Sequence, residues 1–270
     1  MLAKLMARPV HRIATGFVPK ISIAITRKNF TIRTASSPDD IKDLMRLRYD
    51  VFHREYMGKR FPIGYDFDEL DSSADHLMII DNRTDRVVGT YRMILSGIAP
   101  RFYSQSEFVL DSFLREEGLK LELGRACIRK EFRSGILVHL LWRGISEYLR
   151  VVGAKFVFGC SSVKTTDLRE AAMLMAALQG AGHTASNYGI EPTPAFKFSG
   201  YQEELRRQLD IGVAMTDVDG LLPSLVHAYL SMGGKVHGAP ALDSEYRCID
   251  LLTILPMEQF SEKFTRKYLQ

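Results

Sequence analysis

A strand–turn–helix–strand pattern between Leu119 and Cys160 constrains the fold of this chain more than any other stretch. Its first part alternates between apolar and charged residues, which is typical of a strand: Leu119, Lys120, Leu121, Glu122 and Leu123. From Gly135 to Val152 the apolar residues instead recur at three- and four-residue steps, as on one face of a helix. Gly153 follows as a helix stop, and Lys155–Cys160 then forms a second, buried strand.

The turn Arg133-Ser134-Gly135 joins the first of these strands to the helix. A turn in this place brings free backbone N–H groups and a helix N-terminus to one point. Such a point favours an anion, above all a phosphate. The pattern therefore predicts a phosphate site at this turn.

Length and composition indicate a soluble globular protein. The chain has 270 residues, of which 46% are hydrophobic and 25% charged, enough for one large domain or two small ones. No run of eighteen apolar residues occurs, so we expect no transmembrane helix. The three cysteines, Cys127, Cys160 and Cys248, are far apart without metal-ligand spacing. We therefore expect reduced thiols in the cytoplasm and no bound metal.

Basic residues dominate the N-terminal segment 1–30, and no acidic residue precedes Asp39. Apolar residues are interleaved with the basic ones, as in a partly amphipathic segment. Such an arm is able to lie on an anionic membrane surface. An organelle transit peptide, or an arm that is disordered or packs on the core, has similar composition, and these alternatives stay open.

The remaining elements follow from capping residues, alternation and glycine or proline breaks. Ser37 and Pro38 open a helix that we expect to run to about Glu55. The other expected elements are strands at 31–34, 76–81, 86–95, 235–239 and 248–255, and helices at 167–178, 222–232 and the C-terminal end. Because early strands pair as a hairpin and one helix crosses between strands, the order predicts a mixed, mostly antiparallel α/β sheet.

Several motifs, in this order, resemble those of one enzyme family. They are LRYDVFHREYMG, DFDELD, VVGTYRMIL, LELGRACIRKEFR and LLWRGISEYL. The chain from Ile32 to Leu255 resembles the GNAT acyltransferases. More narrowly, it resembles their ornithine-lipid N-acyltransferase, or hemolysin-like, branch, which is similar to the acyl-homoserine-lactone and N-acyl amino acid synthases. The resemblance implies a GNAT-like twisted sheet flanked by helices over 31–270, with 165–232 as a helical and loop insertion and lid.

The resemblance also implies roles for particular residues. Glu122, Arg125 and Arg92 match the catalytic positions, with Glu122 as the base. The positions that match substrate-binding residues are Arg48, Phe52, Asp68 and Asp71. Those that match the pantetheine-phosphate site are Ile128, Arg133, Ser134 and Gly135. The alternatives are a solvent-facing Glu122, a structural ion-pair network around the arginines and an exposed acidic loop at Asp68 and Asp71.

The phosphate turn departs from the family's glycine-rich Arg/Gln-x-x-Gly-x-Gly/Ala pattern. Coenzyme A carries a diphosphate that needs several N–H donors, whereas the pantetheine arm of a carrier protein carries one phosphodiester. The degenerate turn therefore favours acyl carrier protein as the acyl donor.

Together these features predict an N-acyltransferase that moves a long, 3-hydroxylated acyl chain from acyl carrier protein to the α-amino group of ornithine. The product would be lyso-ornithine lipid. We expect no bound cofactor, no nucleic-acid partner, and a peripheral position at the inner face of the cytoplasmic membrane through residues 1–30. The alternatives are another N-acyl amino acid or lactone synthase, the latter requiring S-adenosylmethionine, and a non-catalytic membrane-binding protein.

Overall fold

The computed structural model describes residue 10, residues 12–133 and residues 135–260. These residues form two compact units. The first unit contains the described residues up to Arg101 together with Leu121–Ala154. The second contains Phe102–Lys120 and the described residues from Lys155 onward.

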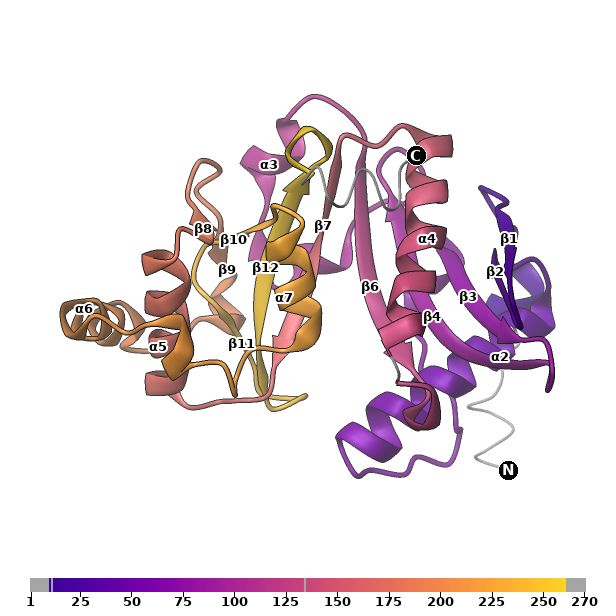
Figure 1. Cartoon of the computed structure of the whole chain (residues 1–270), viewed down its shortest axis with the longest axis horizontal. Coiled ribbons are helices and arrows are strands. Elements are labelled where there is room, and N and C mark those ends of the chain that lie inside the picture. The colour runs from indigo at the N-terminus through magenta and orange to yellow at the C-terminus, as the bar shows by residue number, and fades with distance from the viewer. Residues whose placement is uncertain (1–9, 11, 134, 261–270) are drawn as a thin grey trace. The chain divides into compact units, whose positions relative to one another are not determined.

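An antiparallel sheet forms the centre of the first unit (Figure 1). Its strands pair in the order β1, β2, β3, β4 and β6. Their bounds are Ala24–Arg27, Phe30–Thr34, Asp75–Asp81, Arg86–Leu95 and Lys120–Ile128. The predicted strand at 31–34 and the predicted hairpin are confirmed, and β1 was not expected. The mixed, mostly antiparallel GNAT-like sheet is confirmed as well.

Helices α2 and α4 pack on the sheet of the first unit. Ser37 caps α2 (Pro38–Tyr49), and its side chain accepts a hydrogen bond from the Asp40 backbone N–H. The chain continues helically, but as a π-helix, η1 (Asp50–Tyr56). Helix α4 (Gly135–Val152) has the predicted bounds. It approaches the sheet so closely that a Cβ on Gly144 would lie 2.7 Å from Ile32 Cγ2.

Strand β6 departs from the regular alternation that the sequence predicts. Residues 120–123 are all buried, so both faces of this part of the strand are covered. The pairing with β4 skips between Gly124, opposite Arg92, and Cys127, opposite Thr90. Arg125 lies in this bulge with φ 51°, a left-handed conformation that is uncommon outside glycine.

The second unit is built around β7 (Phe156–Val163) and β12 (Cys248–Pro256), which pair antiparallel. The smaller strands are β5 (Phe108–Val109), β8 (Thr184–Ala185), β9 (Glu191–Pro192), β10 (Lys235–His237) and β11 (Ala241–Asp243). The helices are α3 (Asp111–Arg115), α5 (Leu168–Gly180), α6 (Tyr201–Ile211) and α7 (Ser224–Ser231). Buried side chains of α5, α7, β10 and β12 form one apolar core. The predicted helices at 167–178 and 222–232 and the last two strands are confirmed, whereas α6 was not predicted.

Short 3-10 helices connect these elements. They are η2 (Glu69–Ser72), η3 (Tyr103–Ser106), η4 (Lys130–Phe132), η5 (Pro194–Phe196), η6 (Met215–Asp217) and η7 (Met257–Gln259).

The described part of the N-terminal arm packs on the first unit. Val10, Ala14 and Phe17 are buried in the apolar cluster that includes the inner side of α2, which agrees with the core-packing alternative for these residues. Residues 1–9 and 11 lie outside the described residues, and so do residues 261–270, in the region where a helix of the final residues is predicted. Among the described residues, no helix combines the length and the apolar character needed to span a membrane.

Candidate functional site

Three aspartates reach the first unit's sheet from the loop between η1 and β3. The loop is held by its own hydrogen bonds. Asp68 Oδ1 accepts from the Leu70 N–H at 2.9 Å, and Asp71 Oδ2 accepts from the Asp68 N–H at 2.8 Å. These bonds form a capping box around η2. The box holds the carboxylates of Asp68 and Asp71 against the sheet.

Arg48, on α2, binds two of these carboxylates. Its Nε donates to Asp66 Oδ1 at 2.6 Å. Its Nη1 and Nη2 donate to the two oxygens of Asp71 at 2.7 and 3.2 Å, a bidentate pair. The Arg48 side chain is 1% exposed and the Asp71 side chain 0%, so this pairing lies entirely inside the protein.

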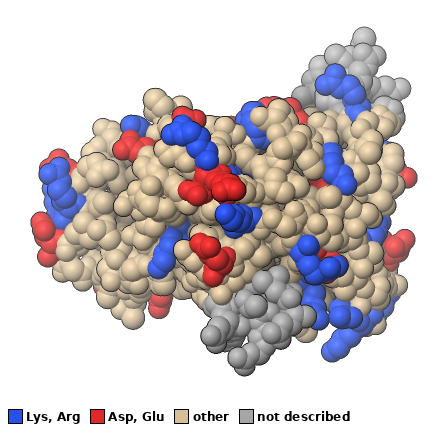
Figure 2. Space-filling model, turned by 90° about the horizontal axis from the view of Figure 1, so that it is seen from above, with Lys and Arg blue, Asp and Glu red and all other residues tan. Residues whose placement is uncertain are grey.

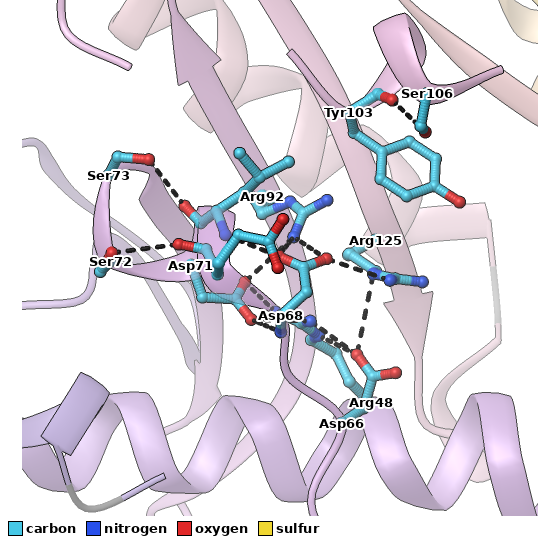
Figure 3. Close-up of polar contacts among 12 residues, drawn as sticks. Arg48, Asp66, Asp68, Asp71, Ser72, Ser73, Arg92, Tyr103, Ser106 and Arg125 are labelled. Carbon is cyan, nitrogen blue, oxygen red and sulfur yellow. Dashed lines mark hydrogen bonds and ion pairs between the residues drawn. The ribbon is translucent and has the colours of Figure 1, made fainter. Parts of the chain in front are cut away.

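Two further arginines complete the arginine–aspartate network, which consists of Arg48, Arg92, Arg125, Asp66, Asp68 and Asp71 (Figure 3). Arg92 Nη1, from β4, lies 2.7 Å from both oxygens of Asp68 and 3.3 Å from Asp71 Oδ1. Arg125 Nη2 donates to Asp68 Oδ2 at 3.2 Å. The bulge in β6 allows Arg125 to join this group, because a residue with φ 51° breaks the strict alternation of the strand.

Electrostatics keep all three aspartates ionised. Burial alone would raise the pKa of Asp66, but the charges of Arg48 and Arg125 outweigh it and hold that pKa well below its usual range. Burial is likewise overcome at Asp71 by Arg48 and Arg92, and at Asp68 chiefly by Arg92, so both pKa values are lowered. Three positive and three negative groups therefore compensate one another in the interior.

Two histidines contact this network, and the sequence did not indicate either contact. His53 Nε2 lies 3.0 Å from Asp66 Oδ2, and its ring stacks on Tyr49 with centroids 5.4 Å apart. His76 Nε2 lies 3.0 Å from the Asp71 backbone carbonyl oxygen, which assigns the proton of the neutral ring to Nε2. Burial lowers the pKa of His76 to about 4, so this ring is uncharged at neutral pH.

Glu122, the predicted base, lies on the sheet face from which Arg92 projects. Gly124 pairs with Arg92, and Glu122 pairs with Ile94; residues two apart in a strand share a face. The Glu122 side chain is 2% exposed. The solvent-facing alternative for Glu122 is therefore wrong.

The alternative of an exposed acidic loop at Asp68 and Asp71 is wrong for Asp71. Every oxygen of Asp71 is bonded within the network, and the side chain is 0% exposed. Asp68 and Arg125 reach the surface, with side chains 22% and 16% exposed. Asp66 was not among the predicted site residues, although the Asp66-Phe67-Asp68 alternation was the signal that could have indicated it.

The predicted phosphate turn is partly described. Arg133 Nε donates to the Ile128 carbonyl at 3.0 Å, and its Nη2 donates to Glu55 Oε2 at 2.8 Å. Gly135 begins α4, whereas Ser134 lies outside the described residues. Phe52 packs beside the apolar cluster of α2. The network holds no free set of metal ligands, because its carboxylates are paired with arginines. The start of α4 is suited to a cofactor's phosphate.

Comparison with known proteins gives consistent matches. Residues 47–143 match the model of the acetyltransferase (GNAT) domain. An L-ornithine N(alpha)-acyltransferase of Rhodobacter capsulatus is 30% identical over 253 residues, covering 89% of this chain and 95% of that protein. One of Rhizobium meliloti is 29% identical over 258 residues, covering 89% and 84%. Among solved structures, FeeM, an N-acyl amino acid synthase from uncultured soil microbes, matches with a TM-score of 0.51 and 12% identity, covering 87% of this chain and 95% of that one; this supports the fold.

Proposed function

Because this chain belongs to the L-ornithine Nα-acyltransferase family, we propose that it joins a long, 3-hydroxylated acyl chain to the α-amino group of ornithine. The product is lyso-ornithine lipid. The observation that carries the proposal is the 30% identity to the Rhodobacter capsulatus enzyme over nearly the whole length of both chains. The buried arginine–aspartate network and Glu122 also support it, because they offer charged groups for the acceptor and a base for the reaction.

Amide formation from a thioester makes three demands. The acceptor ammonium loses a proton, the amine nitrogen attacks the carbonyl carbon, and the carbon–sulfur bond breaks as the thiolate leaves and takes up a proton. Glu122 is the proposed base that receives the first proton, directly or through water. No covalent intermediate on the protein is required.

Asp68 and Arg125 are the proposed contacts for ornithine. They carry opposite charges, lie 3.2 Å apart and are the members of the network with exposed side-chain surface. Ornithine also carries both signs, a carboxylate and ammonium groups. Arg125 would bind the carboxylate and Asp68 an ammonium group. Arg48, Arg92, Asp66 and Asp71 then act as positioning residues that fix these two side chains.

The proposed donor is acyl carrier protein, bound through its phosphopantetheine arm. The phosphodiester would lie at the first turn of α4, where backbone N–H groups point out of the helix. Arg133 would then exchange its bond with Glu55 for one to the phosphate. Ile136, in the first turn of α4, is 61% exposed and offers an apolar contact for the rest of the arm.

The proposed location is the inner face of the cytoplasmic membrane. The product is amphipathic, and the segment 1–30 carries no acidic residue. On the face drawn in Figure 2, acidic and basic side chains lie interspersed among uncharged ones. We therefore assign membrane attraction to the N-terminal segment rather than to that face.

The first test is thiol release from 3-hydroxyacyl carrier protein, with candidate amino acids added one at a time and products identified by mass. We expect release with ornithine and a product of the mass of lyso-ornithine lipid. Glu122→Gln should lower the rate about 100-fold or more, the typical size of a general-base contribution. Glu147→Gln is the matched control, because this half-buried glutamate of α4 pairs with Arg150 of the same helix.

Three outcomes separate the parts of this proposal. Release with another amine would keep the mechanism and change the acceptor. Equal rates with acyl-coenzyme A would remove the carrier-protein assignment. No release with any acceptor, in detergent or lipid, would contradict the enzymatic proposal and favour a non-catalytic membrane-binding protein.

A further inference from the structure

A cavity of about 390 Å³ lies on one face of the sheet in the second unit. Val236, in the middle of β10, belongs to the apolar core of this unit, so its neighbours Lys235 and His237 project from the opposite face. Ile254 of β12 pairs with Lys235 and shares that face. Lys235, His237 and Ile254 all line the cavity. The cavity is therefore built on the side of the sheet that faces away from the apolar core.

Apolar and aromatic side chains form part of the lining of this cavity. Ile254 and Pro256 lie two residues apart on β12 and share a face, and Phe156 of β7 pairs with Pro256. Tyr188 stacks on His237, with ring centroids 5.4 Å apart. A ligand in the cavity therefore meets an apolar surface over part of its body.

Charged side chains of both signs also line the cavity. They are Lys155, Lys235, Glu116 and Glu258. Among the described residues, no ion pair joins these lysines to these glutamates, so all four charges are available to a ligand. An ion of one sign would meet like charges as well as opposite ones, whereas a molecule that carries both signs is attracted at both of its ends.

His237 is an independent observation that points to a ligand. The residue is 5% exposed, and within the described part of the chain its Nδ1 has no hydrogen-bond partner. Burial lowers the pKa of His237 to about 4, so at neutral pH the ring is uncharged and has one donor and one acceptor nitrogen. A buried polar group without a partner costs free energy. Because the ring lines the cavity, a ligand there is able to hydrogen-bond with it.

We propose that this cavity binds a free α-amino acid with an apolar side chain, at a site separate from the arginine–aspartate network of the first unit. The carboxylate binds at Lys155 and Lys235, and the ammonium group at Glu116 and Glu258. The apolar side chain lies on the aromatic and aliphatic part of the lining, and His237 hydrogen-bonds with a polar end of the ligand. The volume is within the range of about 300–1,000 Å³ that is usual for small-molecule sites.

The test is calorimetric titration of the purified full-length chain, without any acyl donor, with three ligands of nearly equal shape. L-leucine carries both charges, 4-methylpentanoate lacks the ammonium group and 3-methylbutylamine lacks the carboxylate. We expect saturable binding of one leucine per chain. Each of the two analogues should bind at least about tenfold more weakly, because each loses the charge-assisted hydrogen bonds at one end.

Three variants place the ligand in the cavity. Lys235→Gln should weaken leucine binding at least about tenfold and leave the binding of 3-methylbutylamine, which has no carboxylate, unchanged. Lys42→Gln is the matched control, because Lys42 is a half-exposed lysine of the first unit that pairs with Asp39, and it should bind leucine as the unaltered chain does. His237→Phe keeps an aromatic ring without its nitrogens and should also weaken leucine binding. If His237→Phe fails to fold, Lys235→Gln still decides.

Two kinds of result would overturn the proposal. One is the lack of saturable leucine binding, or binding of 4-methylpentanoate as tight as that of leucine. The other is leucine binding that Lys235→Gln does not weaken, which would place the ligand elsewhere on the chain. None of these measurements requires acyl transfer, so their outcome is independent of the proposed function.

Discussion

Arg48 illustrates why the charged groups of the first unit are buried as a set. Its guanidinium group has bonds to both Asp66 and Asp71, and neither carboxylate is accessible to water to any useful extent. Moving such ions out of water costs several kcal/mol each, and their mutual attraction offsets this cost only while every partner is present. Loss of a single member should therefore destabilise the whole network.

Removing Arg48 should destabilise the protein strongly. Arg48→Ala leaves Asp66 and Asp71 with lost partners, and breaking a buried pair in this way costs about 3–5 kcal/mol. Arg54→Ala, which removes an exposed i,i+4 pair with Asp50 on the following π-helix, should cost less than about 0.5 kcal/mol. Urea denaturation measures both free energies of unfolding. Similar losses for the two variants would contradict the view that Arg48 is structurally essential.

His76 should make stability depend on pH. Its pKa is about 4 in the folded protein because burial disfavours the charged ring, against about 6.5 when unfolded. The unfolded chain thus binds more protons between these values. Stability is full above about pH 6.5 and is lost as pH falls towards 4, by about 3 kcal/mol for this group. His237 acts in the same direction and window, because burial lowers its pKa to about 4.

To isolate His76, the loss of unfolding free energy between pH 6.5 and 4 is measured for the unaltered chain and for two variants. His76→Gln should reduce that loss, whereas His139→Gln, at an exposed position of α4, should leave it unchanged. The aspartates of the network, whose pKa values are lowered, lose most of their contribution below this window, and all three chains share that contribution. An unchanged loss in His76→Gln would refute the assignment.

At the scale of elements, the first unit depends on two local departures from regular structure. The bulge in β6 brings Arg125 to Asp68, and Gly144 lets α4 approach β2 and β3. A Cβ at Gly144 would meet Leu77 Cδ1 at 2.8 Å and Ile32 Cγ2 at 2.7 Å. Each departure depends on a single residue. One determines which side chains β6 brings to the network, and the other determines how closely α4 packs on the sheet.

Gly144→Val tests the helix–sheet contact. The added side chain overpacks a buried interface, and we expect a loss of about 1–3 kcal/mol in unfolding free energy. Gly180→Val is the matched control, since a Cβ there would have no described neighbour within 4 Å and valine is a slightly better helix former than glycine. Thermal unfolding should therefore show a lowered Tm for Gly144→Val alone. A lowered Tm in both variants would mean that valine in a helix, and not the close helix–sheet contact, causes the loss.

At the scale of the whole molecule, each unit has its own apolar core. The first core includes Val10, Ala14 and Phe17 from the N-terminal segment, so part of a segment predicted to lie on a membrane is also part of a folded unit. Residues 1–9 precede these buried positions and contain Lys4 and Arg8. This division allows the membrane proposal to be tested without removing core residues.

Deleting residues 1–9 should weaken binding to anionic vesicles and leave acyl transfer from soluble carrier protein unchanged. Each basic residue near an anionic surface contributes about 1 kcal/mol, so the loss of two predicts a decrease in binding of about 30-fold. Flotation with phosphatidylglycerol vesicles measures this, with neutral vesicles as the control. Equal flotation of both chains would assign membrane attraction, if present, to another part of the protein.

Sequence patterns alone predicted most regular elements and the family. Helix α4 has the predicted bounds because its apolar residues repeat with helical period and Gly153, with φ 65°, ends it. The hairpin of β3 and β4 follows from alternation and a turn. Capping, periodicity and glycine breaks are local properties, so they can be recognised in the sequence without knowledge of the fold.

Tertiary structure alone decided which charged residues meet. Nothing in the sequence near His53 or Arg48 indicates that both contact Asp66, which lies 13 and 18 positions further along the chain. In the sequence, the acidic run 66–71 is typical of a solvated loop. In the structure, three arginines from α2, β4 and β6 surround it. Charge pairing and burial depend on distances in space, and these exist only once the strands have paired and the bulge has set their register.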